Sequence, residues 1–312
     1  MIIKLHEKDL VSQTEDNSVY YRNNGEVVLT SYEVFPGIQL VYEDIHSQEF
    51  EIKREVNTTL IEISHCREGR IEGNVKNEFY YLSPGDISIK LKKDTKSKVF
   101  FPSRHYHGLS LLIDIERTPY CLSCFLKDVN VKPVMLMDKF CKKDSLFVMR
   151  AKPELEHVFL ELYSVPESIR RGYFKVKVLE ILLFLSGIDI NEVDFAQRCV
   201  PNSQVILAKK VCQYLTENME QRFTIEALSV QFKVSQTLLK SSFKSVYGTS
   251  VYSFVRKQKM LEACLQLKRT NKTIMEIAGN FGYDNGSKFA KAFREVVKVS
   301  PAEYRKHEKV DT

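Results

Sequence analysis

The chain has 312 residues, which is too long for one typical domain and enough for two domains that each bury a core. Hydrophobic residues make up 44% of it, and no apolar run approaches the roughly 18 to 20 residues that span a bilayer. The first residues contain no apolar signal-peptide core. We therefore expect a cytoplasmic protein without a membrane segment.

Positive charge is concentrated in the last third of the chain. From Gln204 onward, 19 Lys and Arg stand against 10 Asp and Glu, a net charge of +9, whereas the residues before Gln204 carry −3. A basic module beside a slightly acidic one indicates a polyanionic partner for the C-terminal part. Because many solvated surfaces are also basic, this interpretation needs a matching geometry.

Short strands are predicted between residues 26 and 115. Apolar and β-branched runs such as Val27–Thr30 and Ile38–Tyr42 alternate with turn signals such as Phe35-Pro36-Gly37 and Ser83-Pro84-Gly85-Asp86. Many short strands with regular turns are typical of an antiparallel barrel or sandwich.

The apolar spacing then changes to a helical period, over residues 154–163 and 169–185. The second of these segments carries a broad apolar stripe that fits either the core of its own domain or a dimer interface. The stripe includes Tyr173, Val176, Leu179 and Leu183, and is broadened by Leu182, Phe184 and Leu185. The α+β chain is thus expected to divide into an N-terminal domain over 1–190, a linker over 191–203 and an all-helical domain over 204–312.

The helical domain contains two copies of one helix-turn-helix pattern. The apolar positions of the first helix recur after 49 residues, Ile225, Leu228 and Phe232 as Ile274, Ile277 and Phe281. Those of the second helix recur after 50 residues, Leu239 and Phe243 as Phe289 and Phe293, so the second turn is longer by one residue. Ser235 and Thr273 are expected to cap helices, and Gly248 to end one. The segment Val251–Leu267, without Gly or Pro, is predicted to be a rigid helical connector.

In each copy, the second helix has a polar or cationic face opposite its apolar stripe. The first copy places Gln236, Thr237, Lys240, Ser241 and Lys244 there, and the second places Gly286, Ser287, Lys288, Lys291 and Arg294. Such a helix can present its side chains to base edges and phosphates in the major groove of DNA. A polar face is often merely solvated, but the duplication, the connector and the charge together favour double-stranded DNA as the partner.

A specific resemblance supports this interpretation. The strings that carry it are Ile277-Ala278-Gly279-Asn280-Phe281-Gly282-Tyr283, Ser287-Lys288-Phe289, Phe293-Arg294 and Ser300-Pro301-Ala302-Glu303-Tyr304-Arg305. With the residues around them, these strings make up a segment of about a third of the chain. This segment resembles the DNA-binding domain of the AraC/XylS family of bacterial regulators. Two positions depart from the family's pattern: Lys298 stands where glycine is usual, and Lys259 where arginine is usual.

The resemblance implies a transcription regulator, usually an activator working with RNA polymerase, that reads asymmetric DNA sites with two recognition helices. By position, it implies contacts to bases from Gln236, Thr237, Lys240, Ser241, Gly286, Ser287 and Lys291, and contacts to phosphates from Lys244, Lys288 and Arg294. It also implies a cupin-like N-terminal barrel followed by helices, which senses a small-molecule effector or forms a homodimer.

The N-terminal domain shows no comparable ligand motif, and we expect no catalytic residue, cofactor or metal there. His105-Tyr106-His107 places two imidazoles on one strand face, with His46, His65 and Cys66 as neighbours, but no Glu follows until Glu116. Cys121 and Cys124 form the only close cysteine pair, and no second pair completes a zinc site. The alternatives left open are a cupin-type metal-dependent enzyme with a DNA-binding tail and an architectural DNA-binding protein without an effector.

Overall fold

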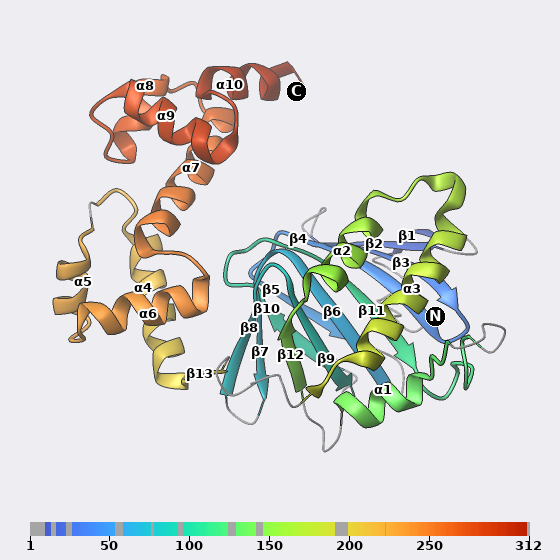
Figure 1. Cartoon of the computed structure of the whole chain (residues 1–312). Helices are drawn as coiled ribbons and strands as arrows, with labels where there is room; N and C mark the ends of the chain where they lie inside the picture. The colour runs from blue at the N-terminus through green and yellow to red at the C-terminus, as the bar shows by residue number, and fades with distance from the viewer. Residues whose placement is uncertain are drawn as a thin grey trace. The chain divides into compact units, whose positions relative to one another are not determined.

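The computed structural model describes residues 10–13, 17–22, 27–53, 59–75, 78–92, 96–123, 129–141, 146–190, 199–221 and 223–310. The chain divides into two compact units, residues 1–199 and 200–312 (Figure 1). Of the expected linker 191–203, residues 191–198 lie outside the described residues. No helix in the described ranges is both long enough and apolar enough to cross a membrane.

The strands of unit 1 form two antiparallel sheets (Figure 1). The larger sheet has the order β1 (Leu10–Gln13), β2 (Asn17–Arg22), β3 (Val27–Phe35), β4 (Ile38–Ile45), β11 (Tyr106–Asp114), β6 (Leu60–Gly69), β9 (Asp86–Lys92) and β12 (Leu146–Arg150). In the smaller sheet, unit 1 contributes β8 (Glu78–Leu82), β7 (Ile71–Val75), β10 (Lys96–Phe100) and β5 (Glu49–Lys53), in that order. A two-residue strand, β13 (Cys199–Val200), lies at the boundary of the units. The antiparallel architecture is as predicted, but among the described strands neither sheet closes into a barrel.

The two faces of the larger sheet pack against different partners. Along β11, Leu109, Leu111 and Ile113 belong to a core shared with helices, whereas Tyr106 and Leu112 belong to a core shared with the smaller sheet. This division follows from the period of two in a strand, which sends successive side chains to opposite faces. Unit 1 is therefore a three-layer arrangement of helices, larger sheet and smaller sheet.

The helices of unit 1 cover the outer face of the larger sheet (Figure 1). They are α1 (Pro133–Phe140), α2 (Pro153–Glu161), the 3-10 turns η4 (Leu162–Ser164) and η5 (Glu167–Ile169), and α3 (Arg170–Gly187). The broad stripe predicted for α3 is divided between two sides of the helix, since Val176 is 61% and Leu183 43% exposed, whereas Leu182 and Leu185 are buried. The buried side chains are Phe174, Val178, Ile181, Leu182 and Leu185. Because α3 is apolar on most of its circumference, the position of the sheet decides which face is covered.

From Asn202 onward, all the regular secondary structure in the described part of unit 2 is helical (Figure 1). Its helices are α4 (Asn202–Glu217), α5 (Ile225–Gln231), α6 (Gln236–Tyr247), α7 (Val251–Arg269), α8 (Ile274–Asn280), α9 (Gly286–Val297) and α10 (Pro301–Val310). Helix α4 packs against α6, and α7 packs against α9 in the same way. In the C-terminal half, α7, α8 and α9 enclose Leu267, Ile277, Phe289 and Phe293, each fully buried.

Candidate nucleic-acid interface

The first helix pair, α5 and α6, is defined by local capping. The Thr224 hydroxyl accepts a hydrogen bond from Ala227 N (3.1 Å) at the start of α5, and Ser235 accepts from Leu238 N (3.2 Å) at the start of α6. Each bond satisfies an amide that has no partner inside its helix. Between the helices, Lys233 adopts a left-handed φ of 54°, and α6 ends at Gly248 with φ 73°.

The second pair, α8 and α9, repeats this construction. Thr273 and Glu276 form the predicted capping box, with Thr273 N donating to Glu276 Oε2 (2.6 Å) and Glu276 N donating to Thr273 Oγ1 (3.2 Å). Asn285 caps α9 by accepting from Ser287 N at 2.8 Å; this cap was not among those predicted from the sequence, although Asn is a favoured N-cap residue. Helix α9 ends at Lys298 in a left-handed conformation, φ 73°.

The repeat extends beyond the pairs to the helices that follow them. Ser250 caps α7 and, 50 residues later, Ser300 caps α10, where Ser300 N donates to Glu303 Oε2 (2.8 Å) and Glu303 N donates to Ser300 Oγ (3.2 Å). The box at Ser300 is the one predicted from the sequence. The predicted offsets also hold for the helix bounds, because α5 and α8 start 49 residues apart and α6 and α9 start 50 apart.

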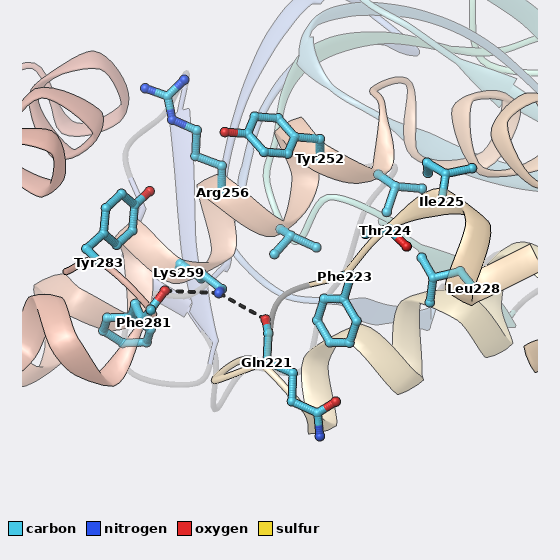
Figure 2. Close-up of a pocket in the computed structure, with 13 residues that line it drawn as sticks. Gln221, Phe223, Thr224, Ile225, Leu228, Tyr252, Arg256, Lys259, Phe281 and Tyr283 are labelled. Atoms are coloured by element: carbon cyan, nitrogen blue, oxygen red, sulfur yellow. Dashed lines mark hydrogen bonds between the residues drawn. The ribbon is translucent and has the colours of Figure 1, made fainter.

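A buried lysine joins the two halves of unit 2 (Figure 2). Lys259, on α7 and 7% exposed, donates from Nζ to Phe281 O at 3.0 Å and to Gln221 O at 3.3 Å. It lies beside a cavity of about 500 Å³ whose lining includes Phe223, Tyr252 and Arg256. The lysine that stands at the usual arginine position is therefore a structural donor rather than a surface cation.

All but one of the side chains predicted to contact DNA are exposed on α6 and α9. The exposed ones are Gln236, Thr237, Lys240, Ser241 and Lys244 on α6, and Ser287, Lys288, Lys291 and Arg294 on α9; Gly286 is half-buried. The Ser241 hydroxyl donates to Leu238 O of its own helix at 3.1 Å. None of the five cations forms an ion pair with any residue that the structure describes. Each helix thus presents positive charge that no acidic side chain in the described ranges neutralises.

The candidate ligand groups of unit 1 separate into two places. His46, His105 and His107 come together where the neighbouring strands β4 and β11 of the larger sheet end and begin. His65 lies apart from them, fully buried, with its Nε2 3.1 Å from Glu156 Oε2 and its ring stacked on Phe159. Burial lowers the pKa of His65. Cys66 faces the smaller sheet. Cys124, the second cysteine of the close pair, lies outside the described residues.

Comparisons with known proteins agree with this picture of unit 2. The family model of a helix-turn-helix domain matches residues 228–307. The uncharacterized HTH-type transcriptional regulator YdiP of Escherichia coli is 34% identical over 101 residues, which are 32% of this chain and 33% of YdiP. The HTH-type transcriptional regulator MtrA of Neisseria gonorrhoeae is 25% identical over 168 residues, 52% of this chain and 56% of MtrA. The matches thus span less than two thirds of either relative.

Among solved structures, the C-terminal domain of AraT, a response regulator from Geobacillus stearothermophilus, is 30% identical to the matched part. The match covers 32% of this chain and 84% of that one, with a TM-score of 0.32. The helical unit and its family match define a helix-turn-helix protein. More particularly, the C-terminal third of the chain is similar to the helix-turn-helix parts of transcription regulators such as YdiP and MtrA.

Proposed function

We propose that unit 2 binds double-stranded DNA sequence-specifically, with two helix-turn-helix units whose recognition helices, α6 and α9, enter successive major grooves. The observation that carries this proposal is the pair of exposed polar faces with five cations that have no acidic partner in the described protein. Cations without internal partners are available to phosphates, and their binding releases counterions from the DNA.

On α6, we assign base contacts to Gln236, Thr237, Lys240 and Ser241, which share one exposed face near the N-terminus of the helix. The N-terminal residues of a recognition helix lie deepest in the groove, and the amide and ammonium groups match the hydrogen-bonding atoms of base edges. Lys244 lies one turn further along and is assigned to a phosphate.

On α9, the proposed base contacts are Ser287 and Lys291, with Gly286 at the start of the helix, and the phosphate contacts are Lys288 and Arg294. Gly286 occupies the place that Gln236 has on α6, 50 residues earlier. Because glycine offers no side chain to a base, the second unit is expected to rely more on DNA shape and backbone contacts than the first.

Helix α7 suits a connector between two grooves. With 19 residues at a rise of about 1.5 Å each, it is about 28 Å long, close to the spacing of about 34 Å between successive major grooves on one face of DNA. Lys259 ties this helix to both halves of unit 2 through its two carbonyl acceptors.

For unit 1, we propose a cupin-like sensing domain that binds a polar effector between its two sheets. Ser110 Oγ donates to Glu43 Oε1 at 3.0 Å on this inner side, and burial raises the pKa of Glu43 to about 7. Three hydroxyls there, of Ser31, Ser88 and Tyr106, are buried without a hydrogen-bond partner in the described part of the chain. Such hydroxyls are suited to a ligand with polar groups. In this proposal the effector adjusts the regulator's action on RNA polymerase in the cytoplasm, most simply as an activator.

A homodimer through α3 completes the proposal. Its outer face leaves Val176, Leu183 and Phe184 between 41% and 61% exposed, which is unusual for large apolar side chains grouped on one helix. Light scattering on the full chain, compared with a Leu183→Glu variant, tests this: loss of a dimer in the variant supports the interface, and a monomeric wild type refutes it.

The DNA proposal is tested by selecting bound duplexes from a random library with the full-length protein. We expect a motif of two blocks whose centres lie about one helical turn apart. Lys240→Ala should reduce discrimination at one base pair by about 1–3 kcal/mol, whereas Lys244→Ala should weaken binding to all sequences and reduce the salt dependence. Lys210→Ala, which removes an exposed charge from α4, is the matched control and should do neither.

Generic, salt-sensitive binding without an enriched motif would refute sequence-specific reading. Equal losses on target and random DNA for Lys240→Ala would remove that residue from the base contacts. For the sensing domain, the measurement is a thermal shift of the full chain against a panel of polar metabolites, and a shift that disappears in a Ser110→Ala variant would support the inner site.

A further inference from the structure

The larger sheet of unit 1 carries a second group of polar side chains, on the face opposite the inner site. Strand pairing sets His107 on β11 against Asp44 on β4 and against Glu68 on β6. A register shift in the β6 pairing, between His107 and Gly108, brings Glu68 into this row. The result is a carboxylate on each side of one imidazole: Asp44 Oδ1 lies 2.8 Å from His107 Nε2, and Glu68 Oε2 lies 3.9 Å from His107 Nδ1.

Two further imidazoles stand beside this row, just beyond the ends of the strands. His105 Nδ1 lies 3.4 Å from His46 Nδ1, and His105 Nε2 lies 3.4 Å from Glu68 Oε2. His46 Nε2 is 2.9 Å from Asp44 Oδ1. One nitrogen from each of the three histidines falls within 4.8 Å of the others.

The backbone holds these groups together tightly. Gly69 follows Glu68 with a left-handed φ of 83°, and a Cβ at this position would lie 1.9 Å from His105 O. Only glycine therefore allows the end of β6 to approach the segment that carries His105. The ligand groups lie on three adjacent strands, β4, β11 and β6, or one residue beyond their ends, and the sheet fixes the spacing of these strands.

The contact between His107 and Asp44 has an unusual geometry. The Nε2 of His107 is shielded from solvent and lies 2.8 Å from Asp44 Oδ1, but the two atoms are not aligned as a hydrogen bond. Two ligand atoms of one metal ion face the ion and not each other, so this arrangement is compatible with a cation that both atoms bind.

We propose that His46, His105 and His107, with Asp44 or Glu68, bind a divalent transition-metal ion such as Zn²⁺. Three imidazoles and a carboxylate are a ligand set that suits Zn²⁺ and its neighbours in the first row. In a tetrahedral site, ligand atoms about 2.1 Å from the metal lie about 3.4 Å from one another, so the imidazole nitrogens, now within 4.8 Å of one another, must move closer by up to about 1.4 Å. His46 is exposed and the other two imidazoles are half-buried, which leaves their rings free to rotate inward.

The site differs from the inner one in position and in chemistry. His107 lies on the face of β11 that also carries Leu109 and Leu111, which pack toward the helices, and not on the face of Tyr106. The sequence predicts no metal there, because no Glu follows His107 until Glu116. The structure supplies the carboxylates from β4 and β6 instead.

The test uses the untagged full-length protein, stripped with a chelator and titrated with Co²⁺ near neutral pH, where most imidazoles are unprotonated. We expect one ion per chain, a visible absorption band of protein-bound Co²⁺, and its displacement by Zn²⁺. His46→Gln, His105→Gln and His107→Gln should each weaken binding at least about tenfold. His157→Ala is the matched control, because His157 lies on α2 with its side chain 72% exposed and should bind no ion.

Circular dichroism of each variant separates loss of the site from loss of the fold. A folded His107→Gln protein that binds Co²⁺ as tightly as the wild type overturns the proposal, as does a wild type without saturable binding. Asp44→Asn and Glu68→Gln identify the carboxylate ligand by which of them weakens Co²⁺ binding. If neither does, the assignment of a carboxylate ligand is wrong. The result does not depend on DNA binding, since the readout is the metal alone.

Discussion

Replacing Lys298 by glycine should stabilise unit 2. Lys298 ends α9 with φ 73° and ψ −7°, and the residue that ends α6 in the equivalent place is Gly248, with φ 73° and ψ −1°. The same backbone turn is thus made once by glycine and once by a residue with a side chain. For an L-residue this left-handed conformation costs about 1–2 kcal/mol, which glycine does not incur.

Two opposing effects reduce the expected gain. Glycine increases the conformational entropy of the unfolded chain, which lowers the free energy of unfolding by about 0.4–1 kcal/mol. The substitution also removes the hydrogen bond from Lys298 Nζ to Glu295 O (3.1 Å), which is exposed and contributes little. The net effect is a stabilisation of about 0.5–1 kcal/mol, or roughly 3 to 6 °C in the midpoint of a domain of about 100 residues.

The assay is thermal and urea unfolding of the full chain, followed by far-ultraviolet circular dichroism, which weights the helical unit. Lys298→Ala is the matched control, because it removes the same side chain but keeps the Cβ and hence the strain. We expect Lys298→Gly to raise the midpoint and Lys298→Ala to leave it nearly unchanged. Equal gains in both variants would show that the long side chain, and not the backbone, is unfavourable; a loss in Lys298→Gly would refute the reasoning altogether.

Three other substitutions follow from the structure. Lys259→Met removes the donor to Gln221 O and Phe281 O and should destabilise unit 2 by about 2–3 kcal/mol in urea unfolding, whereas Lys259→Arg should retain most of the stability. Burial raises the pKa of Glu43 in the folded chain to about 7, from a value of 4.5. Between these two pH values the folded chain keeps a proton that the unfolded chain has lost, so the free energy of unfolding should fall as pH rises from about 4.5 to about 7. Glu43→Gln should flatten that pH dependence in urea unfolding. Thr273→Ala should cost about 1 kcal/mol through loss of the capping box, and an unchanged midpoint would count against it.

The sequence by itself determined the helices of unit 2 and their repetition. Caps such as Thr273 and Ser300 depend on neighbours within a few positions, so their signals are local. The offsets of 49 and 50 residues come from comparing two such local patterns. The exposed faces of α6 and α9 follow from the same periodicity once one face is buried. Antiparallel strands in unit 1 were also predictable, because alternating apolar residues and turn signals are local too.

Only the tertiary structure decided which residues far apart in the chain meet. His46 and His105 are 59 positions apart, and they are neighbours because β4 pairs with β11 in one register. A shift of that register by one residue would send their side chains to opposite faces, and no local pattern fixes it. The sequence left the buried face of α3 open for the same reason: the helix is apolar on several sides, and the sheet it packs against selects one of them.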